Sequence, residues 1–290
     1  QQAGVDFHAL FQLQLMGLYG AFLTADLFNL FVFFEVTLAA SYGLLLHGSG
    51  AFRVRSGLHY IAINLAASLL FLVGVSLIYG VAGTLNMADL AVRLPEVAPQ
   101  DRMLLQAGAA ILGVAFLVKA GMWPLCFWLP GAYSAAAAPV AAMFSIMTKV
   151  GVYAVLRLSP LLLGARAGES ASFGDVGLLT AGLVTMGFGT IGVLASHDMA
   201  RLASYSVLVS SGTLLAAVGM ADAGVTAGAL FYLVSSTLTI GALFLLVELV
   251  DRSQDPAANV LAVTMEAYGD DPEEEEVVEE VGVTLPATLA

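Results

Sequence analysis

Residues 117–149 read LVKAGMWPLCFWLPGAYSAAAAPVAAMFSIMTK, and this stretch decides the fold because it places charges inside long apolar runs. It holds Lys119 and Lys149, the two lysines of the 290-residue chain. A glutamate, Glu35, lies in a similar run, DLFNLFVFFEVTLAASYGLLL. An ionisable side chain at membrane depth costs roughly 2.5–3.5 kcal/mol on insertion scales, so it marks a functional site by default. The three residues together suggest a path for protons or cations through a membrane.

Four residues interrupt regular helix within this stretch: Gly121, Pro124, Pro130 and Pro139. Proline removes a backbone donor and clashes with the preceding turn. A broken helix at membrane depth is tolerated only where it is buried in protein or lines a wet cavity. We therefore expect a turn near residues 130–138, in a segment that meets one of these two conditions.

That turn sets the relative depth of the two lysines. Each lies about ten residues from it, roughly 15 Å along its helix, so Lys119 and Lys149 should reach similar depths on adjacent antiparallel helices. Burial and a nearby like charge both disfavour the charged form of lysine, which suits a proton relay. Glu35 also lies near the middle of its run. If it faces Lys119, it would serve as a gate.

Simpler structural roles stay open for these residues. Lys119 lies near the break, where a lysine often snorkels to the membrane interface, and Glu35 could be a structural hydrogen-bonding group. Ser145 and Thr148 could extend a path beside Lys149, but hydroxyls in membrane helices more often bond a backbone carbonyl. Lys149 is the hardest to explain as structural, because it lies in the middle of its run.

The composition excludes a water-soluble class. The chain is 59% hydrophobic and 11% charged, whereas soluble domains have about 25% charged residues. The net charge of −12 belongs mainly to residues 251–290, which hold eleven of the 22 acids and one arginine and leave a net of −2 on residues 1–250. No basic field exists for nucleic acid.

No cofactor or metal site is expected. The single cysteine, Cys126, has no metal-ligand spacing around it and is interpreted as a small packing residue. The sequence has no phosphate-binding glycine loop, no cysteine cluster and no paired histidines suited to haem. An ion gradient or another subunit would therefore drive any transport.

The apolar runs predict an all-α polytopic membrane protein with about eight spans, because they are near or above the roughly 18–20 residues that cross a bilayer. A membrane barrel would show alternation instead. The spans are expected at residues 7–24, 27–47, 57–80, 103–128, 139–158, 176–196, 202–220 and 225–249.

The connections also carry readable signals. Asp26 is a plausible N-cap of the second span, residues 48–56 form a short basic loop, and NMADLAVRL (86–94) predicts an interfacial amphipathic helix. Residues 251–282 predict an acidic solvated linker, and residues 283–290 the start of a further span. Because the chain begins Gln-Gln and stops in a new apolar run, we expect an internal piece of a longer protein. The arginines divide equally between the two sides, so the positive-inside rule does not fix the orientation.

Three segments together resemble a known family. They are LTADLFNLFVFFEVTLAASYGLL, FLVKAGMWPLCFWLPGAYSAAAAPVAAMFSIMTKVGVYAVLR and SHDMARLASYSVLVSSG. They resemble the antiporter-like membrane subunits shared by respiratory complex I and the multisubunit Mrp/Pha-type monovalent cation/proton antiporters, nearest to the D-type subunits of the latter. The resemblance covers essentially the whole chain.

The resemblance implies a fold and roles. Full-length members have about fourteen helices with inverted repeats. Residues 1–158 would be the first five-helix repeat and residues 159–250 a partial second repeat. Glu35 and Lys119 would form the gating pair, and Lys149 would lie on the central proton axis.

The chain also departs from the family. Ala200 replaces a lysine that many members carry, and Ser235, Ser236 and Ile240 lie where many carry a histidine. The ionisable residue of the next helix would lie beyond Ala290.

These observations favour a transporter rather than an enzyme. The expected function is a membrane subunit of a monovalent cation (Na⁺ or K⁺)/proton antiporter in a bacterial cell membrane, with other subunits of the complex, protons, Na⁺ or K⁺ and the lipid bilayer as partners. Two alternatives stay open: a proton-pumping subunit of a complex I-like oxidoreductase or membrane-bound hydrogenase, and a scaffold that conducts no ions. Three buried charges argue against the scaffold, because a packing surface would use small and apolar residues.

Overall fold

The structure is a computed structural model that describes residues 6–47, 50–163 and 174–254. The regular structure of this part of the chain is helical, apart from one isolated β-bridge. Two short 3₁₀ turns, Leu94–Glu96 and Pro99–Asp101, follow α4. The α-helices are α1 (Phe7–Leu23), α2 (Leu27–Leu46), α3 (Ala51–Ala82), α4 (Met87–Arg93), α5 (Arg102–Ala120), α6 (Trp128–Ala135), α7 (Ala138–Leu163), α8 (Asp175–Leu194), α9 (Met199–Gly219) and α10 (Ala223–Gln254).

The all-α membrane class is confirmed. Seven of the described helices are long and apolar enough to cross a bilayer, and α1 is a shorter apolar helix. Every predicted span corresponds to one of these eight helices. Large hydrophobic side chains such as Leu23 and Leu194 are exposed on the outside of the bundle, as expected for a surface that faces lipid rather than water.

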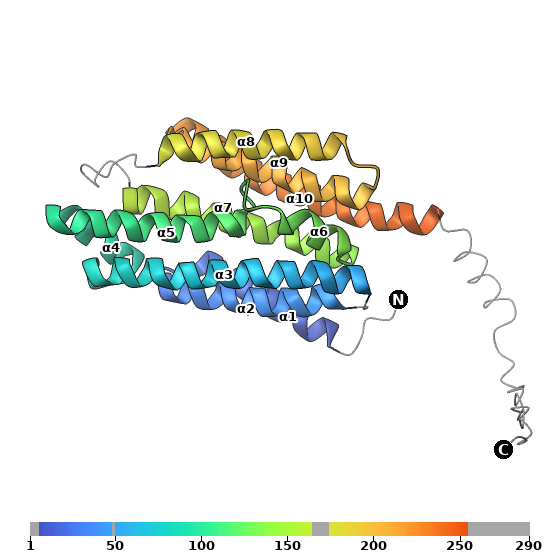
Figure 1. Cartoon of the computed structure of the whole chain (residues 1–290), viewed down its shortest axis with the longest axis horizontal. Coiled ribbons are helices and arrows are strands. Elements are labelled where there is room, and N and C mark those ends of the chain that lie inside the picture. The colour runs from blue at the N-terminus through green and yellow to red at the C-terminus, as the bar shows by residue number, and fades with distance from the viewer. Residues whose placement is uncertain (1–5, 48–49, 164–173, 255–290) are drawn as a thin grey trace, which may run out of the picture. The chain divides into compact units, whose positions relative to one another are not determined.

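The helices up to Glu248 form one compact unit, and a second unit starts at Leu249. Within the first unit, α1, α2 and α3 lie on one side and α8, α9 and α10 on the other, with α5, α6 and α7 between them (Figure 1). α3 packs on α5, α5 on α7, and α7 on α9. The middle layer is therefore enclosed by protein on both sides.

Glycines allow the closest helix contacts. A Cβ added to Gly74 of α3 would lie 2.8 Å from the backbone N of Leu112 in α5, and one added to Gly182 of α8 would lie closer still to the backbone N of Ala216 in α9. Small residues let membrane helices approach backbone to backbone, where dispersion contacts replace the missing hydrophobic driving force.

The span expected at residues 103–128 is present but ends earlier than predicted, because α5 ends at Ala120. Gly121 has a left-handed φ of 71° and caps the helix, as glycine commonly does. The turn expected near residues 130–138 is also wrong in part. Residues 128–135 form α6, and the link to α7 is Ala136 and Ala137.

Two of the expected helix breakers lie within helices. Pro130 and Pro139 are in the first turns of α6 and α7. Proline is tolerated there because the first backbone N–H groups of a helix have no intrahelical partner. The break therefore falls between Gly121 and Phe127, the segment that contains Pro124.

The basic loop expected at residues 48–56 is wrong from Ala51 onward, where α3 begins. Arg53 lies in its first turn and donates from Nε to the carbonyl of Ala135 and from Nη1 to the carbonyl of His47, both at 2.7 Å. These carbonyls lie at the C-terminal ends of α6 and α2, where intrahelical donors are missing. Arg53 thus joins three helix ends.

The N-cap predicted at Asp26 is confirmed. Its Oδ1 accepts hydrogen bonds from the backbone N–H groups of Phe28 and Asn29, both at 2.9 Å. The connection that contains Asp26 also pairs with the one before α4, since Leu27 donates to the Leu85 carbonyl. The α1–α2 connection is therefore joined to the α3–α4 connection.

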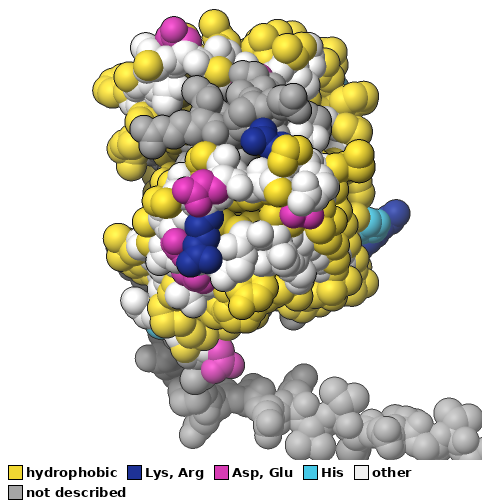
Figure 2. All heavy atoms as spheres, turned by 90° about the vertical axis from the view of Figure 1, so that its left-hand side faces the viewer, with side chains coloured by type: hydrophobic (Ala, Val, Ile, Leu, Met, Phe, Trp, Pro, Cys, Tyr) yellow, Lys and Arg dark blue, Asp and Glu magenta, His cyan; other side chains and the backbone are white. Residues whose placement is uncertain are grey.

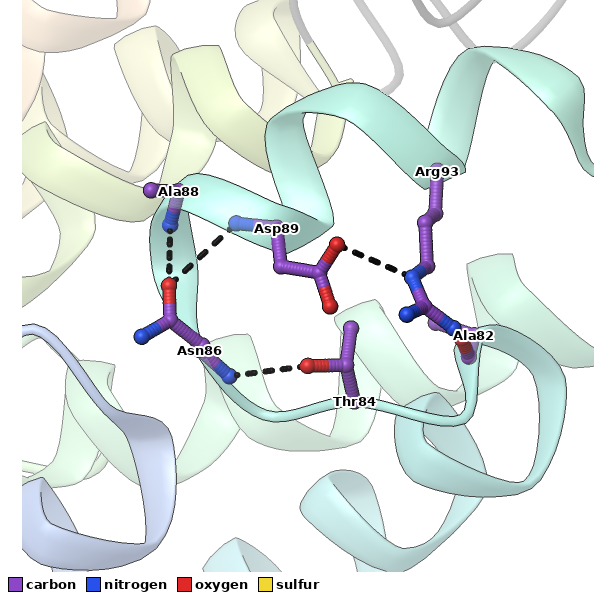
Figure 3. Close-up of polar contacts among 6 residues, drawn as sticks. All are labelled: Ala82, Thr84, Asn86, Ala88, Asp89 and Arg93. Atoms are coloured by element: carbon purple, nitrogen blue, oxygen red, sulfur yellow. Dashed lines mark hydrogen bonds and ion pairs between the residues drawn. The ribbon is translucent and has the colours of Figure 1, made fainter.

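The short helix predicted at NMADLAVRL is present as α4 (Figure 3), and its place at the membrane interface stays a prediction. Asn86 caps it by accepting from the backbone N–H groups of Ala88 and Asp89, at 3.0 and 3.2 Å. Arg93 donates to Asp89 at 2.9 Å. That hydrogen bond and a second one from Thr84 lower the pKa of the Asp89 carboxyl.

Charged side chains gather at one end of the molecule. Figure 2 shows acidic and basic side chains together on the end that lies at the left in Figure 1, with hydrophobic side chains around its rim. This pattern agrees with helices that cross an apolar layer and end in water.

α10 continues through Gln254, so the linker predicted from residue 251 begins later than expected. The rest of that linker and the further span predicted at 283–290 lie outside the described residues.

Candidate functional site

Lys119 occupies the last turn of α5 and is buried, with 7% of its surface exposed. Its ammonium nitrogen lies 5.0 Å from the ring centroid of Phe34, on α2. An aromatic face attracts a cation through the ring quadrupole, and more strongly where water is excluded. The left-handed Gly121 fixes this position because it ends the helix two residues later.

Glu35 is the next residue on α2 after Phe34 and is half-buried. Its carboxylate accepts a hydrogen bond from the hydroxyl of Ser68, on α3. The charge of this carboxylate acts on the Lys119 ammonium, although the two groups do not form a salt bridge. α2, α3 and α5 thus bring together the two side chains that the sequence suggested as a pair.

Lys149 lies in the middle of α7 and is 1% exposed. Its ammonium nitrogen has no hydrogen-bond partner among residues 6–47, 50–163 and 174–254. A buried polar group without a partner is destabilising, and native proteins supply protein or ordered water as partner to nearly all of them. Lys149 therefore differs sharply from Lys119, which has an aromatic ring and a carboxylate nearby.

The two lysines lie at the same level of the bundle, as the sequence predicted. α5 and α7 pack together and run antiparallel (Figure 1). A Cβ added to Gly151 would lie 2.9 Å from the carbonyl carbon of Lys119 and 2.7 Å from the backbone N of Ala120. Because Gly151 is two residues from Lys149, the helix contact itself aligns the two lysines.

Ser145 and Thr148, the residues suggested as a path beside Lys149, donate their hydroxyl protons to backbone carbonyls of their own helix. Ser145 donates to the Ala142 carbonyl at 2.7 Å, and Thr148 donates to the Ser145 carbonyl at 3.1 Å. Their hydroxyl oxygens still have acceptor capacity. These bonds to backbone carbonyls are the ones expected if Ser145 and Thr148 have a structural role.

A buried aromatic group beside this site escaped the sequence analysis. Tyr60 of α3 lies against Trp128 of α6 with ring centroids 5.3 Å apart, and its hydroxyl is 2.6 Å from that of Ser41. Tyr133, also on α6, donates to the Phe144 carbonyl at 2.7 Å. In an apolar run these residues look like ordinary packing, so only the assembled helices reveal them.

His, Cys, Asp and Glu side chains do not cluster in the described part of the chain. The residues of that part contain no group of three or more His, Cys, Asp or Glu side chains that could hold an ion. Cys126 is a free, buried thiol.

The contact between α9 and α10 uses hydroxyl groups rather than charges. Ser210 of α9 donates to Ser236 of α10 at 3.0 Å. Ile240, one turn further along α10, is buried in the hydrophobic core.

The family model described as "NADH:quinone oxidoreductase/Mrp antiporter, TM" matches residues 24–265. A relative in Rhizobium meliloti (strain 1021), named as a probable D-type subunit of a K(+)/H(+) antiporter, is 68% identical over 288 residues, which are 99% of this chain and 53% of that protein. The corresponding D-type Na(+)/H(+) antiporter subunit of Alkalihalophilus pseudofirmus is 42% identical over 240 residues, covering 82% of this chain and 48% of the relative.

Two solved structures contain chains that are similar to this one. The structure of the Mrp complex from Dietzia sp. DQ12-45-1b includes a chain that matches with a TM-score of 0.74 at 32% identity, over 81% of this chain and 43% of that one. A chain of the archaeal membrane-bound sulfane sulfur reductase matches with a TM-score of 0.78 at 30% identity, over 84% and 50%. The chain spans about half the length of the curated relatives it matches. It belongs to the NADH:quinone oxidoreductase/Mrp antiporter transmembrane family.

Proposed function

We propose that this member of the family is part of a membrane subunit of a multisubunit monovalent cation/proton antiporter, and that it passes protons through Glu35, Lys119 and Lys149. The observation that carries the proposal is the pair of lysines buried at one level of two packed helices. A protein that merely spans a bilayer gains nothing from such groups, because each is costly at membrane depth.

Glu35 and Lys119 act as the entry pair. The carboxylate attracts the Lys119 ammonium, and protonation of Glu35 removes that attraction. The Phe34 ring keeps the ammonium on the α2 side of the bundle. Ser68 orients the carboxylate from α3.

Lys149 acts as the central carrier. Because no described residue accepts a hydrogen bond from its ammonium, the protein offers little to hold a proton there. A group in this environment exchanges its proton readily with water or a neighbouring carrier, whereas a salt-bridged lysine would not. Ser145 and Thr148 line the same face of the path in this proposal.

The cation and the setting belong to the proposal as well. The relatives are named as K⁺/H⁺ and Na⁺/H⁺ antiporter subunits, which supports a monovalent cation and partner subunits in a bacterial cell membrane. In the proposed subunit, residues 1–158 form one five-helix repeat and residues 159–250 form part of a second.

The test uses the full-length protein assembled with its partner subunits in everted membrane vesicles. Lys119→Ala and Glu35→Ala should each abolish Na⁺- or K⁺-dependent proton exchange, read with a pH-sensitive dye, while the protein stays in the membrane. Glu35→Asp keeps the charge and serves as the matched control, with partial activity expected. Normal exchange in both alanine variants at native abundance would contradict the proposed role.

A second candidate is a proton-pumping subunit of a redox complex. The similarity to a chain of the sulfane sulfur reductase, a respiratory membrane complex, favours it. The two differ in driving force. Cation-dependent proton exchange in vesicles without any reductant or quinone supports the antiporter, and dependence on an electron donor supports the redox complex.

A further inference from the structure

Trp128 has an unused hydrogen-bond donor deep in the bundle. The residue is the first of α6 and is 3% exposed, and its indole nitrogen has no hydrogen-bond partner in the described part of the chain. The indole N–H can only donate, and leaving such a donor without an acceptor in a dry interior is unfavourable. Some acceptor is therefore required at this point.

The Trp128 side chain lines a small cavity. Its volume is about 20 Å³, and its lining includes Trp128, Lys119, Tyr60, Asn64 and Phe34. A cavity needs about 10–15 Å³ on this measure to hold one water, with two to four polar partners. The space therefore fits one water molecule and excludes a larger ligand.

The lining offers the polar partners that such a water needs. Besides Trp128, the lining includes the buried residues Lys119, Asn64 and Tyr60. The Asn64 amide donates to the Tyr60 carbonyl at 2.9 Å, which holds that side chain in place. The site is thus formed by side chains from α3, α5 and α6 that are fixed by other contacts.

We propose that this cavity is a binding site for a single water molecule, anchored by the Trp128 N–H, and that Trp128 is a positioning residue for Lys119. The role at Lys119 rests on the proposed function; the water site does not. The water oxygen accepts one hydrogen bond from the indole. It accepts a second from the ammonium, or donates one to the neutral amine, so the site keeps its water in both protonation states of Lys119.

The chain provides a matched control because it contains two tryptophans. Trp123 lies in the same break between α5 and α6, but its surface is 42% exposed. Its backbone N–H, which donates to Thr185 at 2.9 Å, is unaffected by a change of side chain. Trp123→Phe therefore removes an indole from the same segment without removing the cavity donor.

Ultraviolet resonance Raman spectra of the full-length protein in its complex test the water site. The difference between wild type and Trp128→Phe isolates the Trp128 indole, and the difference with Trp123→Phe isolates the control. We expect the Trp128 ring mode to report a hydrogen-bonded N–H, and to shift in Lys119→Met because the water loses a partner. A free N–H at Trp128, or no shift in Lys119→Met, would overturn the bridging water.

Vesicle exchange tests the positioning role. Trp128→Phe should slow exchange by about 3- to 10-fold, the range expected from one hydrogen bond, and Trp123→Phe should stay within about twofold, as for a surface change. A bonded N–H together with normal exchange in Trp128→Phe overturns the positioning role alone. Normal exchange in Lys119→Ala contradicts the proposed function, yet leaves the Raman result as a test of the water site.

Discussion

The hairpins α1–α2 and α8–α9 are built alike but carry different chemistry. An aspartate caps the second helix of each, Asp26 in α2 and Asp198 in α9, and glycines bring the helices of each pair into contact. Nine residues after Asp26 lies Glu35, whereas nine residues after Asp198 lies Val207, which is fully buried. The α8–α9 hairpin is therefore built without a carboxylate at this position, as expected if Glu35 has the role proposed above.

The same contrast extends to the third helix of each group. α3 supplies Ser68 as a partner for Glu35. α10 supplies Ser236 as a partner for Ser210, a hydroxyl. One region of the molecule supports a charge, and the other pairs two neutral groups between its helices.

The largest expected effect is on Lys149. Lys149→Leu should lower cation/proton exchange by about 10²–10⁴-fold, the contribution typical of a positioned proton-transfer group. The protein should accumulate normally, since the change removes a buried donor that lacks a described partner. Exchange in vesicles and abundance by immunoblot give the two measurements. Ser211→Ala in α9 is the control, because it also removes a buried polar atom without a described partner. This variant should leave exchange within about twofold of wild type.

A charge placed in the α8–α9 hairpin should destabilise the protein. Val207→Glu is expected to destabilise the protein by roughly 2.5–3.5 kcal/mol, the insertion cost of an ionisable group at mid-membrane. Glu35 has the Ser68 hydroxyl as its partner, whereas Val207 lies within a hydrophobic cluster. The measurement is protein abundance and melting temperature in detergent. Val207→Thr, which keeps the shape, should accumulate; equal abundance of Val207→Glu and wild type would remove the distinction between the hairpins.

The two caps should behave alike, because they are common to both hairpins. Asp26→Ala and Asp198→Ala should each cost about 1 kcal/mol of stability, the usual value for an N-cap. Exchange per folded molecule should not change, and thermal denaturation beside vesicle exchange measures both quantities. Replacement by Asn, which caps as well as Asp, should restore stability, and loss of exchange in the Asn variants would show that these carboxylates do more than cap.

The smallest effect is expected at the hydroxyl pair. Ser210→Ala should cost about 0.6 kcal/mol, the average for an interhelical hydrogen bond in a membrane protein. Thermal denaturation measures it, with Ser236→Ala and the double variant closing a mutant cycle. A coupling energy near zero would mean that the 3.0 Å contact adds nothing to the packing of α9 on α10.

Local signals explain what could be predicted from the sequence. The spans follow from the length of the apolar runs, and the cap at Asp26 follows from a side chain that accepts from the backbone N–H groups two and three residues later. Both depend on residues close together in the chain. The equal depth of Lys119 and Lys149 was predicted from ten helical residues on each side of a turn, but α5 ends one residue after Lys119. The close packing of Gly151 on α5 aligns the two lysines instead.

Long-range contacts explain the errors and omissions. A proline can break a helix or occupy its first turn, and the local sequence around Pro130 and Pro139 fits both roles. Only the end of α5 at Gly121 shows that these prolines begin new helices. Phe34 and Trp128 are apolar residues in apolar runs, and their places beside Lys119 depend on how α2, α5 and α6 pack. No pattern within one helix contains that information.

The exchange rate of Lys149→Arg is the most direct test of the account. Arginine keeps a positive charge at this position but does not release its proton in proteins, so it separates a proton carrier from a structural cation. In the full-length protein within its complex, the account predicts that Lys149→Arg loses exchange as completely as Lys149→Leu, at normal abundance. Exchange near the wild-type rate in Lys149→Arg would contradict proton transfer through Lys149.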